Sequence, residues 1–213
     1  MIRIFAVSGF KDSGKTTLCM KLLEELARLG VETGYIKRTS ESVLSPCGTD
    51  SGRALSLGVR AALWGSDGLS VEERRAGEIS PEAVASRYFP DAEVVLLEGG
   101  KYLEVPKIWV ESGESRPDSV KGVFMVYDRR APGDGKLRFG AGDEPEMARR
   151  LAAAVRGGSY RSAKIYIGDR PLPMKDFIAD FIRGGVLGML SALKGGESGG
   201  ENVRVYIDGK IKK

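Results

Sequence analysis

Histidine is absent from this chain of 213 residues, and cysteine is scarce. Without histidine, acid–base catalysis by imidazole and most zinc sites are excluded. The two cysteines, Cys19 and Cys47, are far apart and form neither a C-x-x-C pair nor a disulfide framework. Cys19 falls within an expected helix, where we expect it to fill apolar space in the core.

Long apolar runs are also missing. No stretch approaches the roughly 20 residues that a membrane-spanning helix needs. The N-terminus runs directly into an expected strand without a signal peptide, so the sequence predicts a cytoplasmic protein that does not contact a membrane. The net charge of +4 favours small anionic partners such as nucleotides. That excess is too small to indicate nucleic-acid binding, and no basic stripe is interleaved with aromatic residues.

What the chain does contain is a phosphate-binding loop. Residues 9–17 have the sequence G-F-K-D-S-G-K-T-T, which fits the pattern G-x-x-x-x-G-K-[ST]. An apolar, β-branched segment at residues 2–8 predicts a strand before the loop, and leucines at helical spacing follow it as far as Leu29. Strand, glycine loop and helix therefore occur in the order that a P-loop requires.

Phosphate binding explains these residue types. Gly9 and Gly14 permit backbone angles and a close approach that a Cβ atom would block. The loop amides and the first free N–H groups of the helix are then directed at an anion. We expect Lys15 to reach the β- and γ-phosphates, the Thr16 hydroxyl to bind Mg²⁺, and the Thr17 hydroxyl to contact the α-phosphate.

The other loop residues occupy variable positions of the motif. We expect Asp12 to face solvent, because phosphate repels a carboxylate. The predicted nucleotide-binding residues are Gly9, Lys11, Asp12, Ser13, Gly14, Lys15, Thr16 and Thr17. The alternative is a glycine-rich turn without function, which the flanking strand and helix argue against.

Strands and helices alternate as far as residue 156, which predicts an α/β fold of the P-loop NTPase type with a doubly wound, mostly parallel sheet. The expected strands and helices of this sheet lie at residues 33–37, 92–97, 106–110, 122–127 and 137–139, and at 80–88 and 144–155. The polar residues 39–52 predict a long loop, which a short helix at 53–57 and a short strand at 61–64 follow.

The chain changes character after a glycine-rich linker at residues 157–159. Further strands are expected at 163–167 and 203–207, with an apolar helix at 177–193 between them. We therefore expect two units, a P-loop domain over residues 1–156 and a small C-terminal α+β unit over residues 160–213. A unit of about 50 residues buries little surface alone, so it is expected to dock on the main domain or on a second chain.

Acidic residues stand where ligands gather in such a fold. Asp50, in the polar loop, would bind Mg²⁺ directly or through water, or else brace its own turn. Glu98 ends an apolar strand, where it would hold Mg²⁺, orient the attacking water, or accept bonds from loop amides. The predicted metal ligands are thus Thr16, Asp50 and Glu98, and the predicted catalytic residues are Lys15 and Glu98. Asp128, which follows the strand at 122–127, would meet the base. Lys107 is a weaker candidate for a functional residue.

Four segments resemble the MobB family of molybdopterin-guanine dinucleotide biosynthesis adaptor proteins. They are Gly9–Thr17, Asp50-Ser51-x-Arg53 with Gly58 after it, Leu96-Leu97-Glu98-Gly99 and Pro106-Lys107-Ile108, and they occur in the family's order within residues 1–130. The resemblance implies a GTP-binding protein that is weakly active as a GTPase, in a family whose members are often homodimers. Its implied partners are the molybdenum cofactor guanylyltransferase and molybdopterin. Guanine specificity rests on the resemblance alone, because Asn-Lys-x-Asp is absent.

The chain also departs from the family pattern. Arg38 and Thr39 stand where the family carries histidines, and the unit after residue 160 lies outside the shared core. Two other functions remain open. A P-loop small-molecule kinase or ligase would need an acceptor pocket with an aligned base, which the sequence does not locate. A metal-delivery GTPase would need histidine or cysteine ligands. For the GTPase, we expect slow hydrolysis, because no arginine finger is apparent.

Overall fold

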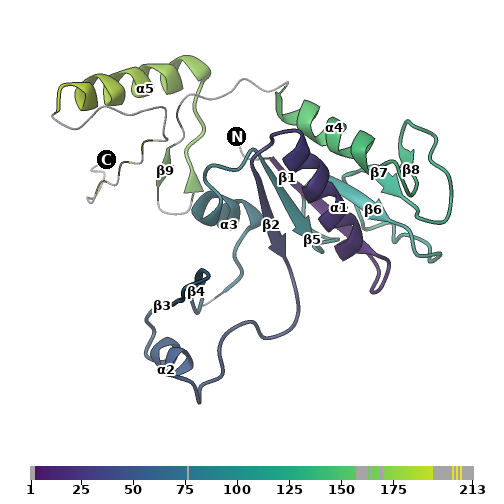
Figure 1. The fold of residues 1–213 in the computed structure, drawn as a ribbon, viewed down its shortest axis with the longest axis horizontal. Helices are drawn as coiled ribbons and strands as arrows, with labels where there is room; N and C mark the ends of the chain where they lie inside the picture. Colours follow the sequence, from purple (N-terminus) through teal and green to yellow (C-terminus); the bar gives the residue numbers. More distant parts are fainter. Residues whose placement is uncertain are drawn as a thin grey trace.

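The computed structural model describes residues 3–75, 77–156, 163, 165–167 and 170–193, with single positions at 203, 205 and 207. Its main sheet has six strands: β1 (Arg3–Gly9), β2 (Thr33–Lys37), β5 (Val94–Glu98), β6 (Lys107–Val110), β7 (Val123–Tyr127) and β8 (Arg138–Phe139). They are arranged in the order β2-β5-β1-β6-β7-β8 (Figure 1), and every pairing between them is parallel. The predicted α/β fold with a mostly parallel sheet is confirmed.

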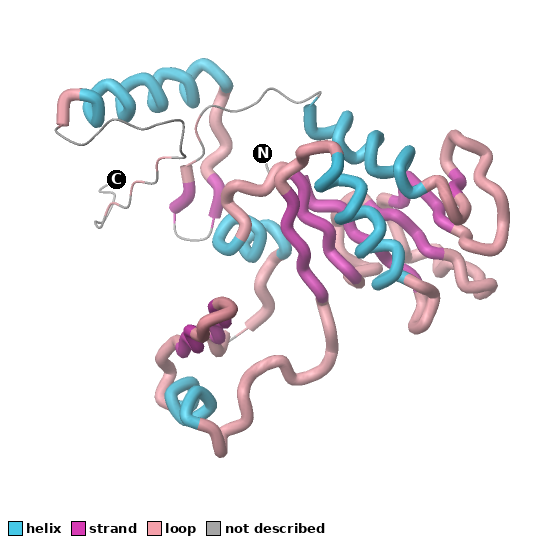
Figure 2. Tube along the Cα trace, in the orientation of Figure 1, coloured by secondary structure: helices cyan, strands magenta, loops and turns pink. Residues whose placement is uncertain are grey.

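Helices cover both faces of this sheet, as expected for parallel strands. Strand β1 alternates its side chains between the faces, so Phe5 and Val7 join one apolar cluster and Ile4 and Ala6 join the other. The first cluster lies under α1 (Lys15–Arg28) and α4 (Glu144–Arg156), which run side by side in Figure 2. The second lies under α3 (Pro81–Tyr88). The sheet therefore separates two cores, and the P-loop follows β1, a largely buried strand in the middle of the sheet.

A long excursion separates β2 from α3. It carries α2 (Asp50–Ser56) and an antiparallel hairpin of β3 (Ala61–Trp64) and β4 (Leu69–Glu72), and Figure 1 shows it projecting away from the sheet. The predicted strand at 61–64 is confirmed as part of this hairpin. The helix begins three residues earlier than predicted, because the Thr49 side chain accepts a hydrogen bond from the Gly52 amide at 3.1 Å and caps it.

Beyond α4, the described residues form a two-stranded ribbon of β9 (Tyr166–Ile167) and β10 (Arg170–Pro171), followed by α5 (Asp176–Ser191). Strand β10 packs beside α3, which connects this segment to the main sheet. The predicted linker at 157–159 lies outside the described residues, as do residues 204 and 206 of the predicted strand at 203–207, so the two-unit division stays a prediction. None of the described helices is long and apolar enough to cross a membrane.

Candidate functional site

The P-loop is fixed in shape by two glycines between β1 and α1. A Cβ atom on Gly9 would lie 2.7 Å from both the Ser13 Oγ atom and the Val110 carbonyl oxygen, so only glycine lets the loop lie this close to β6. Gly14 has a φ angle of 96°, and Asp12 has one of 57°, which aspartate tolerates better than most residues. Successive turns of this kind direct backbone N–H groups into one concave surface, which suits an anion.

The start of α1 adds further free donors to this surface. The first hydrogen bond of the helix runs from the Leu18 amide to the Gly14 carbonyl at 3.0 Å. The amides of Lys15, Thr16 and Thr17 precede that bond and have no partner within the helix. Gly14 is the N-cap residue and supplies no side-chain cap. The helix end therefore presents N–H groups and a positive dipole to an incoming phosphate.

The other loop side chains adopt positions consistent with anion binding. Lys15 is folded back, and its Nζ atom donates to the Phe10 carbonyl oxygen. Burial lowers the pKa of Lys15, and the nearby carboxylates of Glu98 and Asp12 partly offset that effect. Asp12 is exposed, as expected, whereas Ser13 is buried and its Oγ atom has no partner among the described residues. Lys11 and Thr17 are exposed.

Glu98, at the end of β5, is the polar centre of the site. Its side chain lies 2.7 Å from Thr16, whose hydroxyl donates to Oε1, while the Tyr35 hydroxyl donates to Oε2. The Lys37 Nζ atom lies 3.8 Å from Oε1. Only 5% of Glu98 is exposed. Both carboxylate oxygens are therefore held in place, with Oε1 directed at the first turn of α1.

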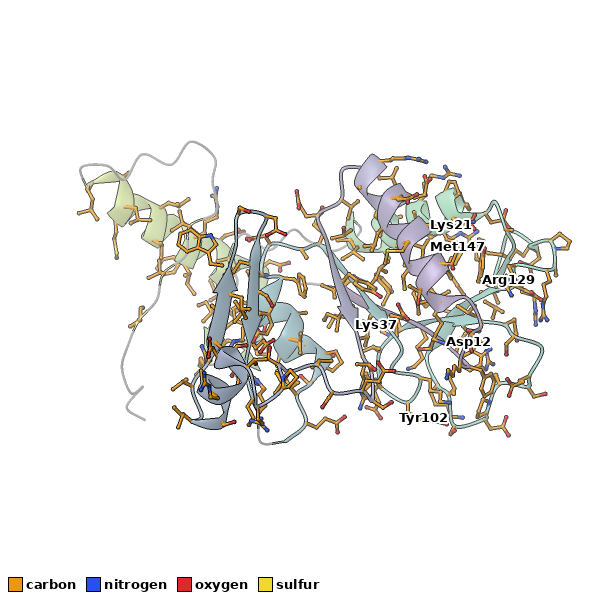
Figure 3. All side chains as sticks on the ribbon, turned by 60° about the horizontal axis from the view of Figure 1, so that its bottom comes forward. Asp12, Lys21, Lys37, Tyr102, Arg129 and Met147 are labelled. Atoms are coloured by element: carbon orange, nitrogen blue, oxygen red, sulfur yellow. The ribbon has the colours of Figure 1, made fainter. Side chains whose placement is uncertain are left out.

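Sequence reasoning missed Tyr35 and Lys37, although it predicted their strand. The register of the sheet sets Lys37 directly opposite Glu98, and Tyr35 lies two positions before it on the same side of β2. Burial, together with the hydrogen bond to Glu98, raises the pKa of Tyr35, so its hydroxyl stays a donor. The alternation of side chains along the strand places Tyr35 and Lys37 on one face. The β2–β5 pairing was needed to show that this face lies beside Glu98. In Figure 3, Lys37 lies at the end of β2.

The structure brings Thr16 and Glu98 together but leaves Asp50 outside this group. The Asp50 side chain is 94% exposed at the start of α2 and pairs with Arg53. Figure 1 shows α2 well away from the start of α1. No group of three or more Asp, Glu, His or Cys residues able to hold a metal ion occurs in the described part of the chain. A divalent cation beside Thr16 and Glu98 would therefore take its other ligands from phosphate and water, as Mg²⁺ usually does.

Lys107 and Cys19 are structural. Lys107 is 1% exposed, and its Nζ atom donates to the carbonyl oxygens of Leu103 and, at 2.9 Å, Val105. It therefore braces the loop after β5 and does not face the P-loop phosphate surface. Burial raises the pKa of Cys19 to about 12, which keeps this thiol protonated in the core below α1, as expected for a space-filling residue.

Residues that follow β7 approach the P-loop from the other side. Asp128 comes directly after the strand, and its Oδ1 atom accepts a hydrogen bond from the Arg130 amide at 3.0 Å. The Nη1 atom of Arg129 lies 3.9 Å from the position that a Cβ atom on Gly14 would take. Figure 3 shows Arg129 and Asp12 near the start of α1. The polar edge therefore extends from β2 across the P-loop to β7.

Comparison with known proteins identifies related sequences. Residues 4–123 match the family described as "MobB: Molybdopterin guanine dinucleotide synthesis protein B". The chain is 30% identical to the molybdopterin-guanine dinucleotide biosynthesis adapter protein of Escherichia coli, over 61% of this chain and 75% of that protein. It is 27% identical to the probable adapter protein of Bacillus subtilis, over 58% of this chain and 73% of the relative. A putative adapter protein of Methanocaldococcus jannaschii is 24% identical, with 97% of this chain and 98% of the relative covered.

Solved structures show the same fold. A MobB protein homolog from Bacillus stearothermophilus superposes with a TM-score of 0.53 at 25% identity, covering 73% of this chain and 99% of its own. MobB of Bacillus subtilis superposes with a TM-score of 0.55 at 24% identity, covering 74% of this chain and all of its own. These structures cover about three quarters of the chain, whereas the sequence relative from Methanocaldococcus jannaschii spans nearly all of it.

Proposed function

The chain belongs to the MobB family, and from that membership we propose that it is an adaptor of molybdopterin-guanine dinucleotide biosynthesis that binds GTP together with Mg²⁺. The observation that carries this proposal is the 2.7 Å hydrogen bond from the Thr16 hydroxyl to Glu98, where the P-loop joins α1. Both residues lie within the segment 4–123 that matches the family. The family assignment and the polar site therefore rest on the same part of the chain.

Phosphate binding follows from the loop itself. The backbone from Gly9 to Thr17 would surround the phosphates, with the unpaired amides at the start of α1 as donors. Lys15, now bonded to the Phe10 carbonyl, would exchange that partner for phosphate oxygens. The exchange is favourable because a hydrogen bond between two charged groups is stronger than one to a neutral carbonyl.

Thr16 and Glu98 would hold Mg²⁺, which neutralises phosphate charge when it is bound. Tyr35 supports this role because it fixes Oε2 of Glu98 and leaves Oε1 directed at Thr16. The Lys37 Nζ atom, 3.8 Å from Oε1 of Glu98, adds a positive charge at the terminal-phosphate side of the site. The predicted metal role of Asp50 would require α2 to move toward the P-loop.

Hydrolysis is proposed to be slow, far below the usual enzyme median of about 10 s⁻¹. A slowly hydrolysed nucleotide suits an adaptor, because the bound state lasts long enough for a partner to respond. The relatives are named as adapters of molybdopterin-guanine dinucleotide biosynthesis. The proposed partners in that process are the guanylyltransferase that attaches GMP to molybdopterin, molybdopterin itself, and a second copy of this chain. A cytoplasmic location completes the proposal, and the two free cysteines are compatible with it.

The test is calorimetric titration of GTP, GDP and ATP, with and without Mg²⁺. Lys15→Ala is expected to abolish nucleotide binding, and Thr16→Ala to remove most of the gain in affinity that Mg²⁺ provides. Lys121→Ala, which removes an exposed lysine outside the loop, is the matched control and should bind like the parent. The proposal is wrong if the Lys15 and Thr16 variants also bind like the parent.

A further inference from the structure

An open pocket of about 400 Å³ is lined by the segment between β4 and α3 and by the last turn of α3. This volume is in the range of small-molecule sites. Arginine and glutamate side chains form most of its wall. The charged lining residues are Glu73, Arg74, Arg75, Glu78 and Arg87.

The Glu73 carboxylate orients the arginines of this pocket. Its Oε2 atom lies 3.0 Å from Arg87 Nη2 and 3.3 Å from Arg60 Nε. Its Oε1 atom lies 3.4 Å from Arg75 Nε, and the Tyr88 hydroxyl donates to Oε2 at 3.1 Å. Because the Glu73 side chain is only 17% exposed, water competes little for these contacts. They hold three guanidinium groups around one carboxylate.

The pocket carries more positive than negative charge. Three arginines and two glutamates line it. Arg60 adds a further contact to Glu73, and the second glutamate, Glu78, lies 2.6 Å from Arg38. Five guanidinium groups thus share two carboxylates, which leaves a surplus of three positive charges. Such a surplus attracts an anion, and guanidinium groups bind phosphate oxygens in pairs.

Arg74 is the lining arginine that a ligand would meet first. It is exposed, and it makes no salt bridge to any described residue. An anion can therefore contact Arg74 without first breaking an ion pair. Arg75 and Arg87 stand in the same wall, already oriented by Glu73.

The pocket lies next to the end of β2, where the nucleotide site begins. The Arg38 amide donates to the Glu98 carbonyl at 3.0 Å, and the Arg38 side chain contacts Glu78 in the pocket wall. A single residue therefore connects the Glu98 backbone to the pocket. Strand β2 lies at the edge of the sheet beyond β5. A ligand in the pocket would thus lie on the Glu98 side of the P-loop and outside the loop itself.

We propose that this pocket binds the phosphate monoester of a small organic molecule, with Arg74, Arg75 and Arg87 contacting the phosphate oxygens. The inference rests on the proposed function, because the proposed partner molybdopterin is a pterin that carries a phosphate monoester. The volume beyond the phosphate would receive the attached organic group. The pocket gives this partner a site beside a bound nucleotide.

The alternative is an ion-pair network that only fastens the β3–β4 hairpin to α3. Arg60 precedes the hairpin, Glu73 follows it and Arg87 belongs to α3, so these three residues suffice for that role. Arg74 takes no part in the network. Its replacement would then alter neither stability nor ligand binding, which separates the two roles.

The first experiment compares neopterin phosphate, a fluorescent pterin with a phosphate monoester, with neopterin, which lacks the phosphate. The full chain is saturated with GDP and Mg²⁺ so that the P-loop is filled, and pterin binding is followed by fluorescence anisotropy. Neopterin phosphate should bind about tenfold more tightly than neopterin or better, as expected for hydrogen bonds between charged groups, and inorganic phosphate should compete with it.

The possible failures of this experiment are distinct. Absence of GDP binding would overturn the proposed function. If GDP binds but neopterin phosphate binds no better than neopterin, the phosphate pocket alone is wrong. Displacement of neopterin phosphate by GDP would also overturn the pocket, because it would place the phosphate of the probe in the P-loop.

The second experiment replaces single positive charges. Arg74→Met should weaken neopterin phosphate binding about tenfold or more and leave neopterin binding, GDP binding and the urea midpoint unchanged. Arg74→Lys, which keeps the charge but not the planar fork, should recover part of the loss. Lys121→Met, which removes one charge from an exposed side chain outside the pocket, is the matched control and should bind like the parent. Parent-like affinity in a folded Arg74→Met variant, or an equal loss in Lys121→Met, would overturn the inference.

Discussion

Replacement of Tyr35 by phenylalanine tests whether the Glu98 carboxylate must be held in place to bind metal. The change removes one hydroxyl and keeps the ring that packs against the main core. That hydroxyl donates to Oε2 of Glu98, while Thr16 donates to Oε1 at 2.7 Å. Because Glu98 is only 5% exposed, water has little access to replace the lost donor. The carboxylate should then rotate more freely, and Oε1 should face Thr16 less often.

The expected magnitude follows from the loss of one charge-assisted bond. Such a bond contributes roughly 1.5–3 kcal/mol, part of which should appear as lower stability. Loss of a residue that orients a metal ligand typically weakens metal binding by about 10- to 100-fold. We therefore expect Tyr35→Phe to weaken Mg²⁺-dependent GTP binding about tenfold, which corresponds to roughly 1.4 kcal/mol. Binding of GDP without Mg²⁺ should not change, because the loop amides and Lys15 remain.

The assay is calorimetric titration of the parent and the variant with GTP and GDP over a series of Mg²⁺ concentrations. Tyr102→Phe is the matched control, since it removes the same hydroxyl from an exposed side chain outside the Glu98 contacts. The control should follow the parent curve. Parent-like Mg²⁺ dependence in a folded Tyr35→Phe variant would refute the argument. So would an equal loss of GTP and GDP affinity without Mg²⁺, since that would indicate damage to the loop.

Three further predictions concern stability and are measured by urea unfolding. Glu144→Gln should cost about 1–3 kcal/mol at pH 7, because it weakens the buried end of the contact with Lys21 that joins α4 to α1. Burial raises the pKa of Glu144, but its hydrogen bonds outweigh that effect and hold the pKa below its usual range. The parent therefore loses this stability as pH falls through the lowered pKa, and the difference in unfolding free energy between parent and variant should shrink there. Lys107→Met should cost about 1–3 kcal/mol, because the carbonyl oxygens of Leu103 and Val105, the second of them buried, lose their donor; unchanged stability would contradict the bracing role. Gly34→Ala should cost about 1–3 kcal/mol, because the added Cβ would lie 2.7 Å from the Phe89 ring, and a neutral result would mean that this ring can move aside.

Much of the site could be predicted from sequence because its signals are local. The P-loop from Gly9 to Thr17 carries its glycines, its lysine and its hydroxyls in one continuous segment. Glu98 was recognisable because it ends an apolar strand. Tyr35 was missed because its role depends on β2 lying next to β5, and the connection between these strands is long. Asp50 was grouped with the metal ligands because it stands in a polar loop, whereas its segment forms a capped helix that lies well away from the start of α1.

The fold was predictable to a similar degree. Strand β5 is a continuous apolar run, typical of a central parallel strand, and all five of its residues are buried. Ser80 and Pro81 correctly predicted the start of α3, since the Ser80 side chain accepts a hydrogen bond from the Ala83 amide at 3.2 Å. Strand β4 was not predicted, because Leu69 and Val71 alternate with polar residues over only four positions and remain exposed. A hairpin outside the core leaves only a weak pattern of burial in the sequence.

The pairing of β1 also determines when the protein can first bind its ligand as it is made. This strand is synthesised before both of its neighbours, because Arg3 pairs with Val94 and Gly9 pairs with Val110, which follow it in the chain. At a synthesis rate of about 5–20 residues per second, the first strand waits roughly 5–20 s for its neighbours. Until residue 110 of 213 has been added, Gly9 has no β6 to lie against, and the phosphate loop lacks its support. Nucleotide capture on the nascent chain would therefore signal that both neighbours of the central strand are in place.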